Sequence, residues 1–193
     1  MALLPEWLKI VRIFPLLALL LVQEGAAQLP VVAKVKPVIY QHLFTAGPAI
    51  PLASFGETHY PGITFSYIRN MDRFRKRDSF KRRKTGWITG ASLSHYFGRK
   101  ENTGPTSFRY RHYSLLEIQG GMNWSPLKQL NFSLRTGPGL GYYNRIFRFT
   151  VTGHLQGSYA IGPKTIITPG CAFIKEPGSD ALWITSLQLG FLF

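Results

Sequence analysis

The sequence predicts an all-β protein, built as an eight-stranded antiparallel up-and-down transmembrane β-barrel. Three observations indicate this class. Apolar and polar side chains alternate with a period of two over several segments, which is the pattern of a strand with two unlike faces. Turn-forming residues separate these segments, and a leader typical of exported proteins precedes them. In a spanning barrel the apolar face meets lipid and the polar face lines the lumen.

Residues 1–27 have the layout of a cleaved secretory signal peptide. Lys9 and Arg12 precede an apolar run over 13–22, and small residues follow up to Ala27. This run is roughly half of the ~20 residues that a membrane-spanning helix requires. We therefore expect cleavage after Ala27 and a single barrel domain over 28–193.

Charge and cysteine content narrow the class further. The formal net charge is +14, and cleavage leaves it unchanged because the leader carries two cations and two acids. Cys171 is the only cysteine, so a disulfide within the chain is excluded. An exported basic protein is expected to meet lipid head groups, lipopolysaccharide phosphates or cell-wall polymers, and we expect no nucleic-acid partner.

The clearest strand covers 145–161, where apolar side chains occupy odd positions and polar ones even positions. The apolar set is Phe147, Phe149, Val151, Leu155, Tyr159 and Ile161, and the polar set is Arg148, Thr150, Thr152, His154, Gln156 and Ser158. The same alternation predicts strands over 130–142, 108–124 and 181–193. Shorter alternating faces predict strands over 85–98 and 62–68. Spacing alone suggests 164–174 and 35–44, which completes eight strands.

The links between these strands fit a meander. With both termini in the periplasm, the short turns at 125–128 and 162–163 would be periplasmic. The links 47–57, 98–105, 143–144 and 175–180 would lie outside the cell. Bacterial barrels usually have short periplasmic turns and longer outer loops. The link 70–84 does not fit this asymmetry, because it would be a long periplasmic connection.

The leader, the alternating strands and the terminal segment 189–193 resemble those of small outer-membrane β-barrel proteins of Gram-negative bacteria. The resemblance implies an outer-membrane location and a porin-like architecture. It also implies insertion by the barrel-assembly machinery, which reads the final aromatic residue, a role that Phe193 would take. The family includes adhesins, membrane-stabilising proteins and enzymes, so the fold alone does not give a function.

A monomeric, non-enzymatic barrel is the expectation that follows, one that stabilises the membrane or contacts surface ligands. An eight-stranded barrel is too narrow for a general porin because side chains fill it. A soluble lipocalin-like barrel is the alternative, and it would reverse the two faces. No metal-ligand spacing or nucleotide fingerprint occurs in the sequence, so we expect no metal and no cofactor.

A strongly basic link is the first candidate site. It could be a solvated turn, or it could hold the phosphates of outer-membrane lipid, lipopolysaccharide or cell-wall polymer. Its cations are Arg73, Arg75, Lys76, Arg77, Lys81, Arg82, Arg83 and Lys84.

Charged side chains on the expected lumen face form the second candidate site. Glu117 is the single acid of this set, and we expect it to pair with Arg135 or Arg148, because charges in a narrow barrel need partners. Either a structural ion network or a gated anion path would result. The full set is Arg109, Arg111, Glu117, Arg135, Arg148 and His154.

His112 and Ser114 form the third candidate site. They resemble part of the His-x-Ser motif of outer-membrane lipid A deacylases, eight-stranded barrels whose catalytic residues face the membrane. The resemblance implies His112 as base and Ser114 as nucleophile. The sequence departs from that family after the serine, where Leu115 and Leu116 follow, and Glu117 has the wrong parity to orient the histidine.

Overall fold

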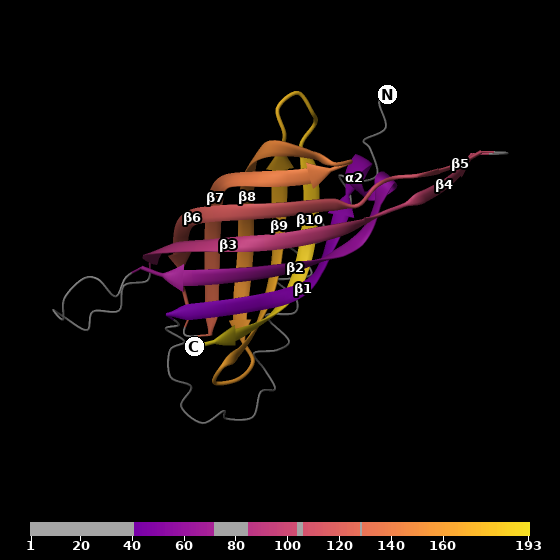
Figure 1. Ribbon diagram of the computed structural model, residues 1–193. Coiled ribbons are helices and arrows are strands. Elements are labelled where there is room, and N and C mark those ends of the chain that lie inside the picture. Colours follow the sequence, from indigo (N-terminus) through magenta and orange to yellow (C-terminus); the bar gives the residue numbers. More distant parts are fainter. Residues whose placement is uncertain (1–40, 72–84, 104–105, 128) are drawn as a thin grey trace, which may run out of the picture. The chain divides into compact units, whose positions relative to one another are not determined.

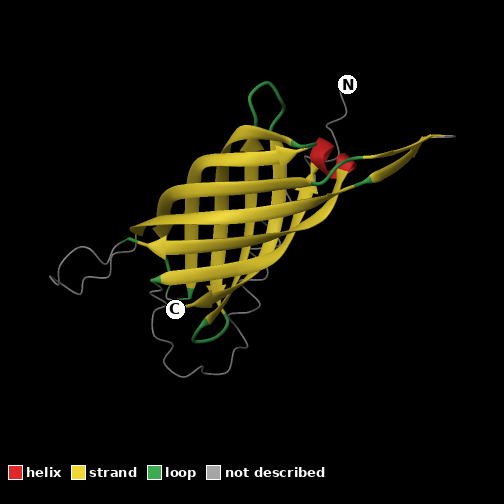
Figure 2. Ribbon diagram, in the orientation of Figure 1, coloured by secondary structure: helices red, strands yellow, loops and turns green. Residues whose placement is uncertain are grey.

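The structure is a computed structural model that describes residues 41–71, 85–103, 106–127 and 129–193. Within these ranges, eight strands close into an antiparallel up-and-down barrel, which confirms the predicted fold class (Figures 1 and 2). The wall consists of β1 (His42–Leu52), β2 (His59–Asn70), β3 (Thr85–Gly98), β6 (Tyr113–Trp124), β7 (Leu130–Tyr143), β8 (Ile146–Ala160), β9 (Thr165–Lys175) and β10 (Leu182–Leu192). β1 pairs with β10 to close the ring. The predicted leader and the cations of the basic link lie outside the described residues.

Side chains alternate across the wall as the sequence pattern predicts. Large apolar residues face outward, such as Trp87 and Leu134, each 64% exposed. Polar residues such as Thr152 and Gln119 are buried in the interior. A soluble barrel would show the reverse arrangement, so the apolar exterior identifies a surface made for lipid. Among the described residues, no helix is long and apolar enough to cross a bilayer.

The first strand differs from the expected 35–44, of which only residues from 41 onward are described. β1 runs over His42–Leu52, so the expected link 47–57 shrinks to the short helix α2 (Ala53–Thr58). Gly47 and Pro48 read as turn residues, yet both lie within the strand. The β1–β10 register passes from Ala46 directly to Ala49, so the missing N–H of Pro48 removes no bridge between these strands.

The expected strand 108–124 is also divided. The β3–β6 ladder ends where Tyr96 pairs with Tyr113. Beyond it, β4 (Lys100–Thr103) and β5 (Thr106–Arg109) form a separate two-stranded ribbon (Figure 1). Backbone pairing continues into the ribbon, since the Tyr110 N–H donates to the Arg99 carbonyl at 2.9 Å. The described part of the predicted outer link, 98–103, is therefore mostly strand. The ribbon residues Phe108 and Arg109 were included in the expected barrel strand because a paired ribbon alternates as a barrel wall does.

The barrel has two distinct ends. At the terminal end, the Phe193 N–H donates to the carbonyl of His42 at 2.9 Å, and the Asn70 N–H donates to the carbonyl of Gln41 at 3.0 Å. The strand ends that flank the basic link, Asn70 and Thr85, thus lie at this terminal end. The loop end carries α2, the β4–β5 ribbon and the hairpin turns between β7 and β8 and between β9 and β10.

The interior is layered along the barrel axis. An apolar cluster at the terminal end comprises Leu43, Ile68, Ile88, Ala160, Ile166 and Leu192. A second one at the loop end comprises Ala49, Phe55, Tyr96, Tyr113, Leu115, Ile174 and Ile184. Polar side chains fill the space between them. Phe55 of α2 belongs to the second cluster and packs against Tyr96 and Tyr113, so this helix caps the loop end of the interior.

Candidate functional site

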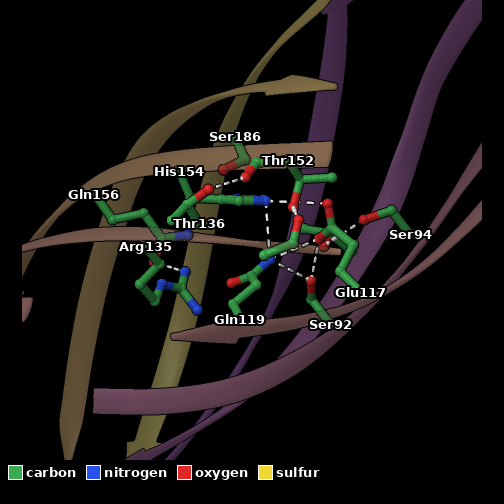
Figure 3. A network of polar contacts seen from close by, with 12 residues as sticks. Ser92, Ser94, Glu117, Gln119, Arg135, Thr136, Thr152, His154, Gln156 and Ser186 are labelled. Atoms are coloured by element: carbon green, nitrogen blue, oxygen red, sulfur yellow. Dashed lines mark hydrogen bonds and ion pairs between the residues drawn. The ribbon is translucent and has the colours of Figure 1, made fainter. Parts of the chain in front are cut away.

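Glu117 is the centre of the interior polar layer (Figure 3). It lies on β6 and is 1% exposed. Its Oε1 lies 3.1 Å from His154 Nε2 on β8, and its Oε2 accepts a hydrogen bond from Gln119 Nε2 at 2.7 Å. The Ser92 hydroxyl on β3 also donates to Oε2. A buried carboxylate needs such partners because removal from water costs several kcal/mol per ion.

The partner of Glu117 is therefore His154, which differs from the expected Arg135 or Arg148. Arg135 is 1% exposed, and its Nη2 donates to Gln156 Oε1 on the adjacent strand at 2.5 Å. Arg148 lies nearer the loop end, where its Nη1 is 3.0 Å from Glu176 Oε2. The alternation within each strand placed these residues on the lumen face, but alternation does not specify their height along the barrel axis.

Arg109 and Arg111 lie outside the lumen, contrary to expectation. Arg109 is an exposed residue of β5, and Arg111 is exposed in the connection between β5 and β6. Both precede Tyr113, the first residue of β6, so neither belongs to the barrel wall. In the same connection the Tyr110 hydroxyl donates to Glu101 Oε2 at 3.1 Å, and this hydrogen bond raises the pKa of the phenol.

A small cavity lies beside the Glu117–His154 pair. Its volume is about 20 Å³, and Tyr96, Ser186 and Gln188 contribute to its lining. Such a volume holds about one water molecule. The two apolar clusters lie beyond the polar layer on either side.

A polar cluster on the outward face was only partly anticipated. Ser114 lies on β6 directly opposite His95 on β3, and His95 Nδ1 is 2.9 Å from the serine Oγ. The His112 ring stacks on the His95 ring at a centroid distance of 5.4 Å and an interplanar angle of 19°. The expected pairing of His112 with Ser114 is therefore replaced by a pairing of His95 with Ser114.

Sequence reasoning missed His95 and Glu176 as members of these clusters. His95 is a single histidine within an otherwise apolar and small-residue strand, and only the β3–β6 register places it beside Ser114. Glu176 follows β9 and is 5% exposed, with its Oε1 accepting a hydrogen bond from the Tyr113 hydroxyl at 2.9 Å. The sequence places Glu176 in the expected outer link 175–180, and no pattern there predicts that its carboxylate contacts Tyr113 of the barrel wall.

A closed eight-stranded barrel with an apolar exterior and buried polar side chains in its interior defines the class: this chain has the fold of an integral transmembrane β-barrel protein. No family model matches the sequence, and no curated protein matches it.

Solved structures match the fold. Ail, the attachment invasion locus protein of Yersinia pestis, matches with a TM-score of 0.53 and 10% identity, over 80% of this chain and 99% of that one. Ail in complex with the heparin analogue sucrose octasulfate matches with a TM-score of 0.50 and 10% identity, over 79% and 96%. OprG from Pseudomonas aeruginosa matches with a TM-score of 0.46 and 9% identity, over 79% and 95%. At these identities the likeness concerns the fold alone.

Proposed function

We propose that this protein is a monomeric, non-enzymatic barrel that binds anionic polymers at the cell surface through its loop end. The first support is the interior, where buried polar side chains and two apolar clusters leave only a small cavity among the described residues. With the termini in the periplasm, the usual arrangement of bacterial barrels, the loop end faces outward. Phe193 at the other end would serve recognition by the assembly machinery.

The distribution of charge at the loop end carries the proposal. Four exposed cations, here called the rim cations, belong to the ribbon, its connection to β6 and the β7–β8 turn. They are Lys100, Arg109, Arg111 and Arg145. Guanidinium and ammonium groups bind sulfate and phosphate oxygens by charge-assisted hydrogen bonds.

The test is a titration of the protein in nanodiscs with sucrose octasulfate, the ligand in the Ail complex. We expect saturable binding in wild type, measured by calorimetry. The triple variant Lys100→Gln, Arg109→Gln, Arg145→Gln should bind about tenfold more weakly, because three charge-assisted contacts are lost. Binding should also weaken at high salt, since the sites are exposed.

A charge-matched control comes from the basic link, whose flanking strand ends lie at the terminal end. The variant Arg82→Gln, Arg83→Gln, Lys84→Gln removes the same charge and should bind as wild type does. Loss of binding in this variant, with the rim variant unaffected, would move the site to the basic link and refute the proposal.

A second candidate function is an esterase that acts on outer-leaflet lipid, and the 2.9 Å contact between His95 Nδ1 and Ser114 Oγ favours it. His95 would accept the serine proton while Ser114 attacks an ester carbonyl, and the same proton would pass to the departing alcohol; water would then hydrolyse the acyl-serine, release the fatty acid and restore the serine hydroxyl. Within the described residues, no carboxylate contacts His95 to orient its ring, which counts against this function.

Incubation of the purified protein with lipopolysaccharide tests the esterase. Mass spectrometry would detect released fatty acid in wild type and in His112→Gln, with none in Ser114→Ala. Unchanged acyl chains after incubation with wild type would exclude this candidate.

A further inference from the structure

The outward face of β3 and β6 becomes polar at its loop end. Elsewhere on these strands the outward positions hold residues such as Leu93 and Leu116, which are 51% and 52% exposed. Near the loop end, outward positions hold polar residues: His95 on β3, Ser114 on β6, and His112 in the connection before β6. Polar groups that face hydrocarbon without partners cost free energy, so this change of character calls for a polar partner or a polar medium.

The geometry of this surface brings several hydrogen-bond donors together. We name it the outer patch, which consists of His95, His112 and Ser114, together with Arg99, which follows His95 by four residues and lies next to Tyr60 on β2. The two imidazoles stack with centroids 5.4 Å apart, and His95 contacts the Ser114 hydroxyl. The Arg99 guanidinium carbon lies 5.5 Å from the ring centroid of Tyr60, a cation–π contact. Across the part of the chain that the structure describes, Arg99 forms no ion pair with a carboxylate.

Aromatic residues place the outer patch at the level of the lipid head groups. The His112 ring meets the Phe97 ring edge-on at 5.8 Å, and Ser114 pairs in register with Tyr142 on β7. Phe97 and Tyr142 both face outward, at 42% and 40% exposed. Rings of this kind concentrate where the bilayer meets water, which is also the depth of lipid phosphates.

We propose that the outer patch binds the phosphate group of an outer-leaflet lipid. Imidazole, hydroxyl and guanidinium groups all donate hydrogen bonds to phosphate oxygens, and the guanidinium adds a fixed positive charge. The patch lies on the side of the barrel among lipid-facing residues, so a lipid head group reaches it directly. This site shares none of the rim cations, and a failure of either proposal leaves the other intact.

The experiment measures lipid retention by the protein purified in detergent, using native mass spectrometry. The probes are diphosphorylated lipid A and the same lipid after removal of its phosphates. We expect wild type to retain the phosphorylated probe about tenfold better than the dephosphorylated one, the scale of a few charge-assisted hydrogen bonds at a partly exposed site.

The variant His95→Gln, His112→Gln, Arg99→Gln should lose that preference, and Arg145→Gln, a rim substitution of the same kind, should keep it. All three substituted side chains of the first variant face away from the interior, and resistance of the barrel to unfolding in cold detergent on a gel checks the fold. Equal retention of both probes by wild type, or an unchanged preference in the folded triple variant, would overturn the proposal. An intact acyl-chain mass in the retained probe separates binding from esterase activity.

Discussion

His154 and His95 occupy opposite faces of the same barrel wall, and their surroundings differ. His154 points inward, where Glu117 and Gln119 contact its Nε2 at 3.1 and 2.9 Å. His95 points outward and contacts the Ser114 hydroxyl and the His112 ring. The inner histidine belongs to a network whose members meet each other, whereas the outer one adjoins lipid and head groups.

This difference teaches which polar residues stabilise the barrel and which serve binding. The partners of Glu117 come from β3 and β8 as well as from its own strand, so the network spans four consecutive strands of the wall, from β3 through β6 and β7 to β8. The outer patch joins the neighbouring strands β3 and β6, the connection before β6, and Arg99 between β3 and β4. Substitutions inside should therefore change stability, and those outside should change lipid binding.

The largest effect is expected from Glu117→Ala, which leaves His154, Gln119 and Ser92 without their shared acceptor. Stranding buried polar groups in this way should lower the free energy of unfolding by about 3 kcal/mol. Urea unfolding in lipid vesicles, followed by tryptophan fluorescence, measures the change. Glu101→Ala, on the exposed ribbon, is the control and should change it by less than about 0.5 kcal/mol. A loss below about 1 kcal/mol for Glu117→Ala would show that the network contributes little.

The two-residue period made the barrel wall predictable from sequence. For β8, the outward set from Phe147 to Tyr159 and the inward set from Thr150 to Ser158 match the alternation in the sequence. The terminal strand β10 follows the same rule, with Trp183 and Leu189 outward. Lipid on one side and packed polar groups on the other impose this period on a spanning strand. The segments 164–174 and 35–44 lack a clear period, and only spacing suggested them.

Strand ends and tertiary partners required the structure. β1 was misplaced because Gly47 and Pro48 are turn formers in most contexts, and only the interrupted β1–β10 register explains why they are tolerated within a strand. The pairing of Glu117 with His154 depends on the relative heights of β6 and β8. Alternation gives the face of a residue but not its height. The contact of His95 with Ser114 could not be predicted for the same reason, because it depends on the register of β3 and β6.

The sharpest test of the inside–outside comparison uses one substitution at two positions. His154→Gln removes a partner of buried Glu117 and should lower the free energy of unfolding by about 1–2 kcal/mol, the scale of one unsatisfied buried group. His95→Gln keeps a hydrogen-bonding side chain at the lipid interface and should change it by less than about 0.5 kcal/mol. The urea transition in vesicles without anionic lipid gives both values under one condition. Equal losses would mean that the outer histidine is a structural element of the β3–β6 pair, and a phosphate ligand would then be unnecessary to explain its presence.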